Sequence, residues 1–277
     1  MFTTNPFAEL SATISPEIMQ AYVILMVLFV IGGTILDTLH KKSAKYFFEN
    51  AEKAAKNATR ELSGAEKKSL MAKTLTNEVL TSSEFSNQKR RMSHLMTMYG
   101  FIVFVATTAI MIFAYPEAKT ETPAILPILW HLGALSLAVG GYWFWFFIRV
   151  DVLAEAKKWY QLARADLFIV SLLAMSTFAL LWSLTSGHGL FLVLFILAST
   201  VLFTTVLWSK FAHMFFKPAA AYQKRVTKAD GSRENLPADF DLTDPEVQRK
   251  FPDIPEYMGT NPPNMGLGIK REEPRHY

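Results

Sequence analysis

Cysteine is absent from this 277-residue chain, and its absence excludes several kinds of redox and metal site at once. Without thiols the protein has no ligands for an iron–sulfur cluster or a thiolate zinc site, and it forms neither a disulfide nor a covalent c-type haem. Dinucleotide-binding fingerprints, phosphate-binding loops and the HExxH motif are also missing from the sequence. Any redox chemistry must therefore use a non-covalent cofactor or a partner protein.

Charged residues are scarce in five long apolar runs, and none lies near the middle of a run. A composition of 51% hydrophobic and 13% aromatic residues is too apolar for an ordinary soluble domain. Each run has roughly the 20 residues that a helix needs to cross a bilayer, which predicts an all-α membrane protein with five transmembrane helices. The lack of midplane charges disfavours a small transporter. The runs are Ile18–Leu36, Leu95–Tyr115, Ala124–Ile148, Leu167–Thr185 and Gly189–Trp208.

Basic residues concentrate in the segments that follow the first, third and fifth runs. The residues before the first run include no Lys or Arg, which is unlike a cleaved signal peptide, and we expect this run to stay in the mature protein. The segment Pro116–Pro123 has Lys119 as its only Lys or Arg, and the turn 186–188 has neither Lys nor Arg. The positive-inside rule therefore predicts an N-terminus outside, a C-terminus in the cytoplasm and a bacterial inner-membrane location.

The predicted domains are a membrane domain, residues 1–218, and a cytoplasmic proline-rich tail, residues 219–277. The membrane domain includes a basic cytoplasmic loop, residues 37–93, that reads as helical and contains a Ser63–Glu66 capping box. The tail shows no helical period, and it is either disordered or a strap that orders against a soluble partner. Apolar anchors such as Phe251 and Tyr257 slightly favour the strap.

Four histidines near the ends of the runs fall into two layers of the predicted bilayer. His94 and His213 lie at the inner ends of the second and fifth runs, where two facing imidazoles would ligate a b-type haem iron. The basic side chains of Arg90, Arg91 and Lys210 are candidates for contacts with the haem propionates. An interfacial histidine without a cofactor is the competing interpretation, because such residues are common.

The outer layer contains His131 and His188, which are weaker candidates for a second haem. His188 is separated from His213 by about 37 Å of helix, so these two histidines do not share one iron. The favoured interpretation of His131 is an interfacial anchor, and that of His188 is a solvated turn residue. His40 and Asp37 follow the first run and are candidates for proton transfer beside a quinone, although a solvated helix end is the simpler interpretation.

Smaller features have structural interpretations. The aromatic stretch Tyr142–Phe147 is typical of an interfacial belt, although it is also suited to flank a flat cofactor. The pairs Gly32-Gly33 and Gly140-Gly141 indicate close helix packing.

The end of the fifth run resembles the gamma, cytochrome b subunit family of respiratory nitrate reductases. The similar motif is Ser209-Lys210-Phe211-Ala212-His213, which precedes Pro218, and the second run adds Arg91-Met92-Ser93-His94 before Gly100-Phe101. The resemblance implies that His94 and His213 ligate the haem nearer the cytoplasm. It also implies that the family's other ligand positions are occupied here by Phe104 and Phe195, which cannot bind iron.

Over its length, the chain resembles the AprM-like membrane proteins that are encoded with dissimilatory adenylylsulfate reductase in sulfur oxidisers. Five runs, a long basic first loop, a cysteine-free sequence and a proline-rich tail support this resemblance. It implies a membrane anchor that passes electrons between a cytoplasmic redox enzyme, adenylylsulfate reductase, and membrane quinone, with haem b as cofactor and quinone reactivity as its only catalysis. We expect lipid and quinone contacts and no nucleic-acid partner. The alternative is a cofactor-free anchor or assembly protein.

Overall fold

The computed structural model describes residues 2–40, 43–83, 85, 87–151, 156–185, 189–209, 211, 213–234 and 245–250. Every regular element within these residues is a helix, so the prediction of an all-helical chain is confirmed there. The α-helices are α1 (Pro6–Leu10), α2 (Pro16–His40), α3 (Ser43–Asn57), α4 (Gly64–Thr74), α5 (Gln88–Ala114), α6 (Ile125–Trp143), α7 (Leu167–Leu184), α8 (Gly189–Thr204), α9 (His213–Ala229) and α10 (Pro245–Lys250). Short π- or 3₁₀-helical segments are η1 (Leu75–Leu80), η2 (Phe144–Ile148), η3 (Arg164–Asp166) and η4 (Val206–Trp208).

Among the described residues, four helical segments are long and apolar enough to cross a membrane, which suggests a multi-pass membrane protein. They are Pro16–His40, Gln88–Ala114, Ile125–Ile148 and Arg164–Leu184. The fifth apolar helix, α8, is shorter, at 16 residues, because the helical backbone stops before Thr205 and resumes as the 3₁₀ turn η4. The five predicted runs thus match five apolar helices in position, and four of them have the length of a span.

The chain divides into two compact units. Unit 1 contains residues 1–48 and 75–220, and unit 2 contains residues 49–74 and 221–277. This division differs from the predicted domains, since part of the loop after the first run groups with the C-terminal segment. The predicted start of the irregular tail, residue 219, is too early, because α9 remains helical to Ala229.

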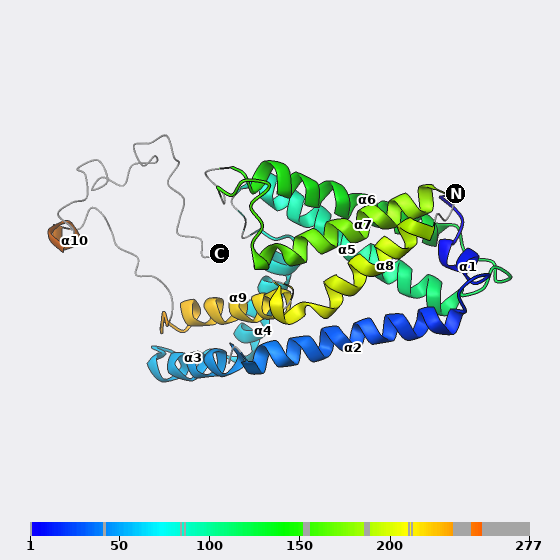
Figure 1. Cartoon of the computed structure of the whole chain (residues 1–277). Coiled ribbons are helices and arrows are strands. Elements are labelled where there is room, and N and C mark those ends of the chain that lie inside the picture. The colour runs from blue at the N-terminus through cyan, green and yellow to red at the C-terminus, as the bar shows by residue number, and fades with distance from the viewer. Residues whose placement is uncertain are drawn as a thin grey trace. The chain divides into compact units, whose positions relative to one another are not determined.

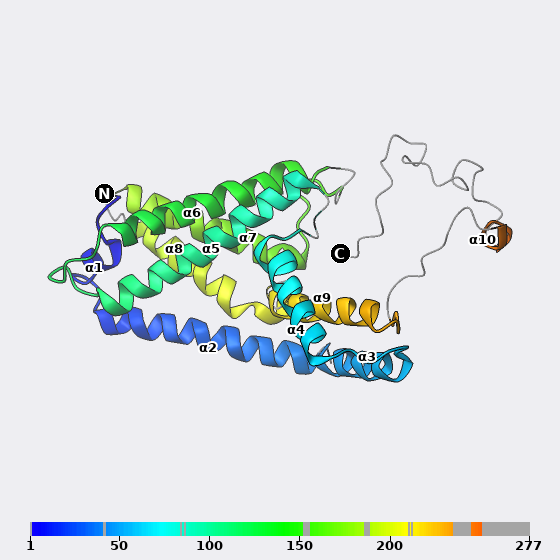
Figure 2. The same ribbon diagram turned by 180° about the vertical axis from the view of Figure 1, so that it is seen from behind.

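Unit 1 is a helical bundle in which α5, α6, α7 and α8 pack together and α2 lies along one side (Figure 1). One end of the bundle, here called the basic end, contains the last turn of α2 and the first turns of α5 and α7. The opposite, N-terminal end contains α1 and the start of α2, and the view from behind shows the same arrangement (Figure 2). Most of α2 is exposed, which is consistent with a lipid-facing helix.

Helices α5 and α6 approach one another closely because glycines lie at their contact, where larger residues would not fit. A Cβ atom at Gly100 would lie 2.6 Å from the backbone nitrogen of Leu137, and one at Gly133 would lie 2.8 Å from that of Phe104. A Cβ at Gly140 would lie 2.8 Å from the carbonyl oxygen of Ser93. The Ser93 hydroxyl donates to the Gly140 carbonyl oxygen at 2.7 Å. Small residues therefore let two backbones touch, as is typical of membrane helix pairs.

The interpretation of the glycine pairs as packing sites is supported at three of the four positions. Gly140 faces α5, Gly141 faces Leu173 of α7, and Gly33 faces Val206 of η4. A Cβ at Gly32 would contact nothing within 4 Å. Gly32 is therefore free of steric constraint in this structure, which makes it a useful control position.

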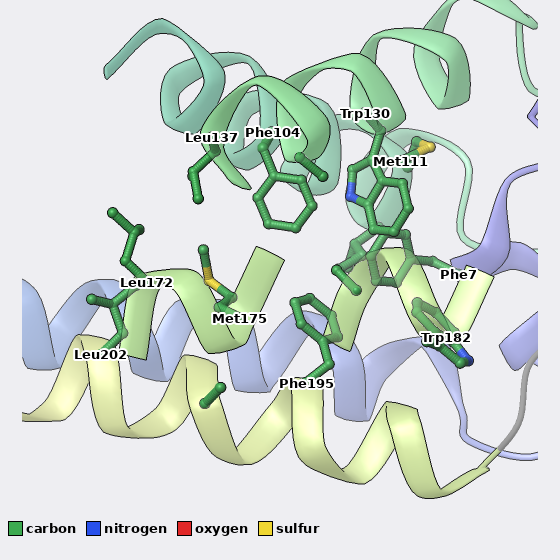
Figure 3. Packing of buried hydrophobic residues seen from close by; sticks show 14 of the residues in the cluster. Phe7, Phe104, Met111, Trp130, Leu137, Leu172, Met175, Trp182, Phe195 and Leu202 are labelled. Carbon is green, nitrogen blue, oxygen red and sulfur yellow. The ribbon is translucent and has the colours of Figure 1, made fainter. Parts of the chain in front are cut away.

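Aromatic side chains fill the centre of the bundle (Figure 3). Phe104 of α5 packs against Trp130 of α6 with ring centroids 5.2 Å apart, and Trp182 of α7 stacks on Phe195 of α8 at 6.0 Å. Phe7 inserts from α1 between the two tryptophans, at 5.8 Å from Trp130 and 5.4 Å from Trp182. All five side chains are buried. They make a continuous apolar core from α5 to α8.

The N-terminal segment closes this end of the core through a cap at Asn5. The Asn5 side chain accepts hydrogen bonds from the backbone N–H groups of Phe7 and Ala8, so it starts α1. Its amide group donates to the carbonyl oxygen of Tyr115 at 3.0 Å and to the hydroxyl of Thr122 at 3.1 Å. The loop between α5 and α6 thus holds α1, and α1 holds Phe7 in the core.

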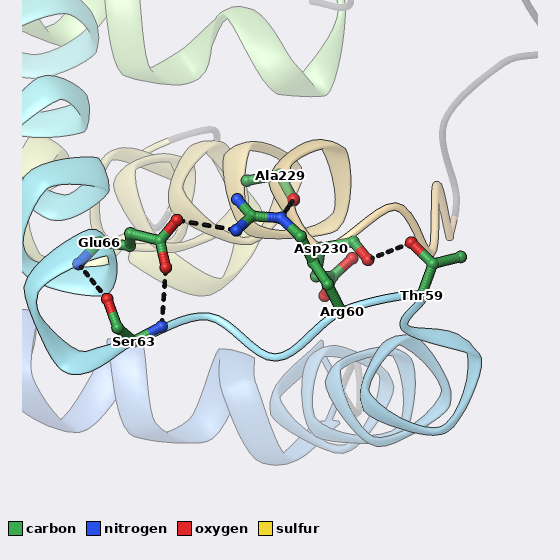
Figure 4. Close-up of polar contacts among 6 residues, drawn as sticks. All are labelled: Thr59, Arg60, Ser63, Glu66, Ala229 and Asp230. Carbon is green, nitrogen blue, oxygen red and sulfur yellow. Dashed lines mark hydrogen bonds and ion pairs between the residues drawn. The ribbon is translucent and has the colours of Figure 1, made fainter.

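Unit 2 joins the segment before α4 to the end of α9 through polar contacts (Figure 4). The Arg60 guanidinium donates to the Ala229 carbonyl oxygen at 2.8 Å, and the Thr59 hydroxyl donates to that of Asp230 at 3.0 Å. Both interactions satisfy carbonyl groups at a helix C-terminus, which lack partners within the helix.

The predicted capping box at the start of α4 is confirmed. The Ser63 N–H donates to the Glu66 carboxylate at 2.8 Å, and the Glu66 N–H donates to the Ser63 hydroxyl at 3.2 Å. Arg60 also pairs with Glu66 at 2.8 Å. These hydrogen bonds to the charged form, above all from the Ser63 backbone, lower the pKa of Glu66 to about 2.

Candidate functional site

At the basic end, the Phe85 side chain contacts residues of both α5 and α9. The Phe85 ring lies 5.0 Å from the half-buried His94 ring, centroid to centroid. The Arg90 guanidinium lies 5.7 Å from the Phe85 centroid, and the Lys217 ammonium group lies 4.8 Å from it. We call these four residues, Phe85, Arg90, His94 and Lys217, the Phe85 cluster. A flat ring is here contacted by one imidazole and two cations.

His213, the predicted partner of His94, is the first residue of α9 and stands one helical turn before Lys217. The side chain of His213 and residue Lys210 lie outside the described residues. The structure links α5 to α9 only through the contacts of Phe85 with His94 and Lys217, and the predicted ligation by His94 and His213 stays a prediction.

Of the predicted propionate contacts, Arg90 belongs to the Phe85 cluster and Arg91 does not. The Arg91 guanidinium donates to the carbonyl oxygen of Thr81 at 2.8 Å, after the π-helical segment η1. Asn87 starts α5 by accepting from the N–H groups of Lys89 and Arg90. This cap fixes the position of Arg90 at the helix start.

His131 is buried in α6, and hydrogen bonds hold both of its ring nitrogens. Nδ1 lies 2.6 Å from the Pro127 carbonyl oxygen, and Nε2 lies 2.7 Å from the Ser183 hydroxyl. A carbonyl oxygen only accepts, so Nδ1 carries the proton, and a neutral ring then accepts at Nε2 from Ser183. The predicted partner, His188, lies outside the described residues. An outer haem on His131 would require the bond to Ser183 to break.

Phe104 and Phe195, which the sequence resemblance would place at ligand positions of the other haem, face one another in the core. The rings of Phe104 and Phe195 lie 6.2 Å apart, and the side chains are 2% and 5% exposed. Trp130 packs against the other side of Phe104. Aromatic side chains therefore fill the space that a second haem would need between α5 and α8.

His40 and Asp37 differ in their surroundings although both lie in the last turn of α2. Asp37 is buried, with 3% of its surface exposed, whereas His40 is exposed and lines a groove with Arg164 and Trp208. The two residues that were predicted to act together are thus a buried carboxyl group and, one helical turn later, a solvent-accessible imidazole.

A buried arginine at the basic end was not predicted as a functional residue. Arg149 follows η2 and is fully buried, with its guanidinium 4.1 Å from the centroid of Trp145. It pairs with Asp166 at 2.5 Å and donates to the carbonyl oxygens of Lys158 and Gln161 at 3.0 and 2.5 Å. The sequence contained a signal for this ion pair, because Arg149 directly follows one apolar run and Asp166 directly precedes the next.

Comparisons of the chain with protein-family models, with curated proteins and with solved structures find no match. The resemblances noted in the sequence therefore stay predictions.

The two layers differ in their fit to haem. In the outer layer, the side chains of Phe104, Phe195 and Trp130 fill the centre of the bundle. The Nε2 atom of His131, which would have to bind the iron, is hydrogen-bonded to the Ser183 hydroxyl. The inner layer has the donor set that haem needs, namely an imidazole for iron and cations for propionates. Phe85 packs against the His94 ring, so its side chain would have to move for that face of the imidazole to approach a haem.

Proposed function

We propose that this protein is a membrane anchor and electron-transfer subunit, which exchanges electrons between a cytoplasmic redox enzyme and membrane quinone. The family resemblance points to adenylylsulfate reductase as the enzyme and to the bacterial inner membrane as the location. By the positive-inside rule, the basic end of unit 1 would face the cytoplasm. A soluble partner would therefore bind at the same end as the Phe85 cluster.

The observation that carries this proposal is the Phe85 cluster. His94 and the start of α9 meet there around an aromatic ring, with Arg90 and Lys217 on either helix. If Phe85 swings away, His94 and His213 are the residues that would hold a b-type haem, and the two cations would pair with its propionates. Such a haem would supply one-electron transfer between the partner and quinone.

The test is a reduced-minus-oxidised absorption spectrum of the purified chain. We expect a b-type spectrum in the unaltered protein, its loss in His94→Ala and His213→Ala, and its retention in His131→Ala. Membrane insertion should be unchanged in all three variants, because the apolar helices alone determine it. A full haem content in either inner-layer variant would overturn the ligand assignment.

A cofactor-free anchor or assembly protein is the second candidate, and the aromatic core favours it. Phe104, Trp130 and Phe195 already fill the bundle centre without a prosthetic group. Close packing of this kind makes the bundle stable by itself. A spectrum without any b-type signal, together with a co-purifying soluble enzyme, would select this function over electron transfer.

A further inference from the structure

A groove of about 690 Å³ opens at the basic end of unit 1, away from the Phe85 cluster residues. Its lining comes from three parts of the bundle: the last turns of α2, the 3₁₀ turn η3 before α7, and the turn η4 after α8. Leu36, Leu207 and Trp208 provide apolar surface, and His40 and Arg164 provide polar groups. The groove thus combines hydrogen-bond donors with an apolar wall at the predicted depth of the membrane interface.

The break between α8 and η4 creates one side of this groove. A continuous helix would carry Leu207 and Trp208 onward, but the turn at Thr205 redirects the chain so that both residues line the groove. Gly33 of α2 lies against Val206 of η4, where a Cβ would be 2.9 Å from the Val206 Cβ. Close packing there holds η4 beside α2.

The other side of the groove is held by the Arg149–Asp166 pair. Arg164 lies in η3, two residues before Asp166, and the Asp166 carboxylate also accepts from the Ala163 N–H at 2.8 Å. Because Arg149 is fully buried and bonded to Asp166 and two carbonyl groups, η3 has a fixed position. Arg149 is therefore a positioning residue for Arg164, which is itself exposed.

A quinone ring has two carbonyl oxygens that accept hydrogen bonds, a flat face and an apolar tail. Arg164 and His40 are donors for the oxygens, Trp208 is a partner for the flat ring, and Leu36 and Leu207 suit the tail. Asp37, buried one turn before His40, disfavours an anionic headgroup at this place when it is ionised.

We propose that this groove binds the headgroup of a membrane quinone, an inference that rests on the proposed function. Arg164 and His40 hold the two oxygens, and His40 transfers protons between the quinone oxygen and water. In the reduction, quinone takes up two electrons from the docked redox enzyme and two protons from water to give quinol. The oxidation reverses each of these transfers.

Binding of decylubiquinone to the purified full-length chain tests this site through quenching of tryptophan fluorescence. We expect saturable quenching, and a dissociation constant raised about tenfold or more in Arg164→Gln and His40→Ala, since each loses a donor to the quinone. Trp208→Phe should remove a large part of the quenching. Lys89→Gln and Trp159→Phe are the matched controls, because both residues are exposed at the same end but do not line the groove.

Three results would overturn the site. Saturable quenching that is equal in Arg164→Gln, His40→Ala and the unaltered chain would place the quinone elsewhere and leave the proposed function standing. No quenching at all would remove both the site and quinone exchange, whereas haem content and enzyme co-purification would still report on the rest of the function. Competition by phosphatidylglycerol that is lost in Arg164→Gln would identify the groove as an anionic-lipid site.

Discussion

Replacing Gly100 with alanine should destabilise the bundle, because the contact between α5 and α6 has no room for one methyl group. The added Cβ would lie 2.6 Å from the Leu137 nitrogen and 2.8 Å from the Gly133 carbonyl oxygen, both backbone atoms. Ordinary contacts begin near 3.4 Å, so α6 would have to retreat by about 0.8 Å. Backbone atoms of a packed helix cannot move aside individually, so the whole helix must shift.

The retreat would also weaken the hydrogen bonds between the two helices. The Ser93–Gly140 bond is 2.7 Å long and the Ser136–Met96 bond is 3.0 Å long. A further ~0.8 Å takes both to or beyond the limit of a useful hydrogen bond, at about 0.6 kcal/mol each in a membrane protein. Together with overpacking, the expected loss in the free energy of unfolding is about 1–3 kcal/mol.

Equilibrium unfolding of the detergent-solubilised chain with sodium dodecyl sulfate, followed by circular dichroism, measures this loss. Gly32→Ala is the matched control, because the same methyl group there would contact nothing within 4 Å. We expect Gly32→Ala to change the unfolding free energy little or to increase it slightly through helix propensity. Equal stabilities of Gly100→Ala and Gly32→Ala would refute the backbone contact between α5 and α6.

Two further predictions concern the basic end and unit 2. Arg149→Met should lower the free energy of unfolding by about 3–5 kcal/mol, because it leaves Asp166 without its buried partner. The double variant Arg149→Met/Asp166→Leu should recover much of this loss in the same unfolding assay. A double variant as unstable as the single one would contradict the account of the pair. The start of α4 should lose its cap in acid, because the pKa of Glu66 in the folded chain is lowered to about 2 from 4.5. The stabilisation of the helix by the Glu66 carboxylate is therefore complete above about pH 4.5 and is lost as the pH falls toward 2. Hydrogen exchange of the α4 amides should show this acid loss in the unaltered chain and not in Glu66→Gln, and an identical pH dependence in both would contradict it.

The positions of the helices followed from sequence because apolar runs and capping residues are local signals. The predicted run Leu167–Thr185 differs from α7 by one residue at its end, and the Ser63–Glu66 box forms as expected. The break at Thr205 was missed, because the sequence there has no charged residue and contains neither glycine nor proline. The hydropathy of a sequence indicates the length of an apolar helix and its depth in the membrane, but not the residue at which its backbone turns.

For the candidate sites, the sequence predicted individual residues and their depth in the membrane, but not their contacts. The chain position of His131 indicated a buried or interfacial histidine, but its bond to Ser183 depends on how α6 packs against α7. The contact of Phe85 with Lys217 joins residues that are distant in sequence, so no spacing rule predicts it. The same holds for the groove, whose lining comes from three separate segments.

Electron transfer from a docked enzyme to quinone is the central claim, and one measurement tests it directly. The tagged chain is isolated from its native membranes in mild detergent, the co-purifying proteins are identified by mass spectrometry, and decylubiquinone reduction is recorded with the enzyme's substrate. We predict that a soluble redox enzyme co-purifies and reduces the quinone only while this chain is bound to it. Absence of any redox enzyme, or an equal rate of quinone reduction by the enzyme without the chain, would contradict the account.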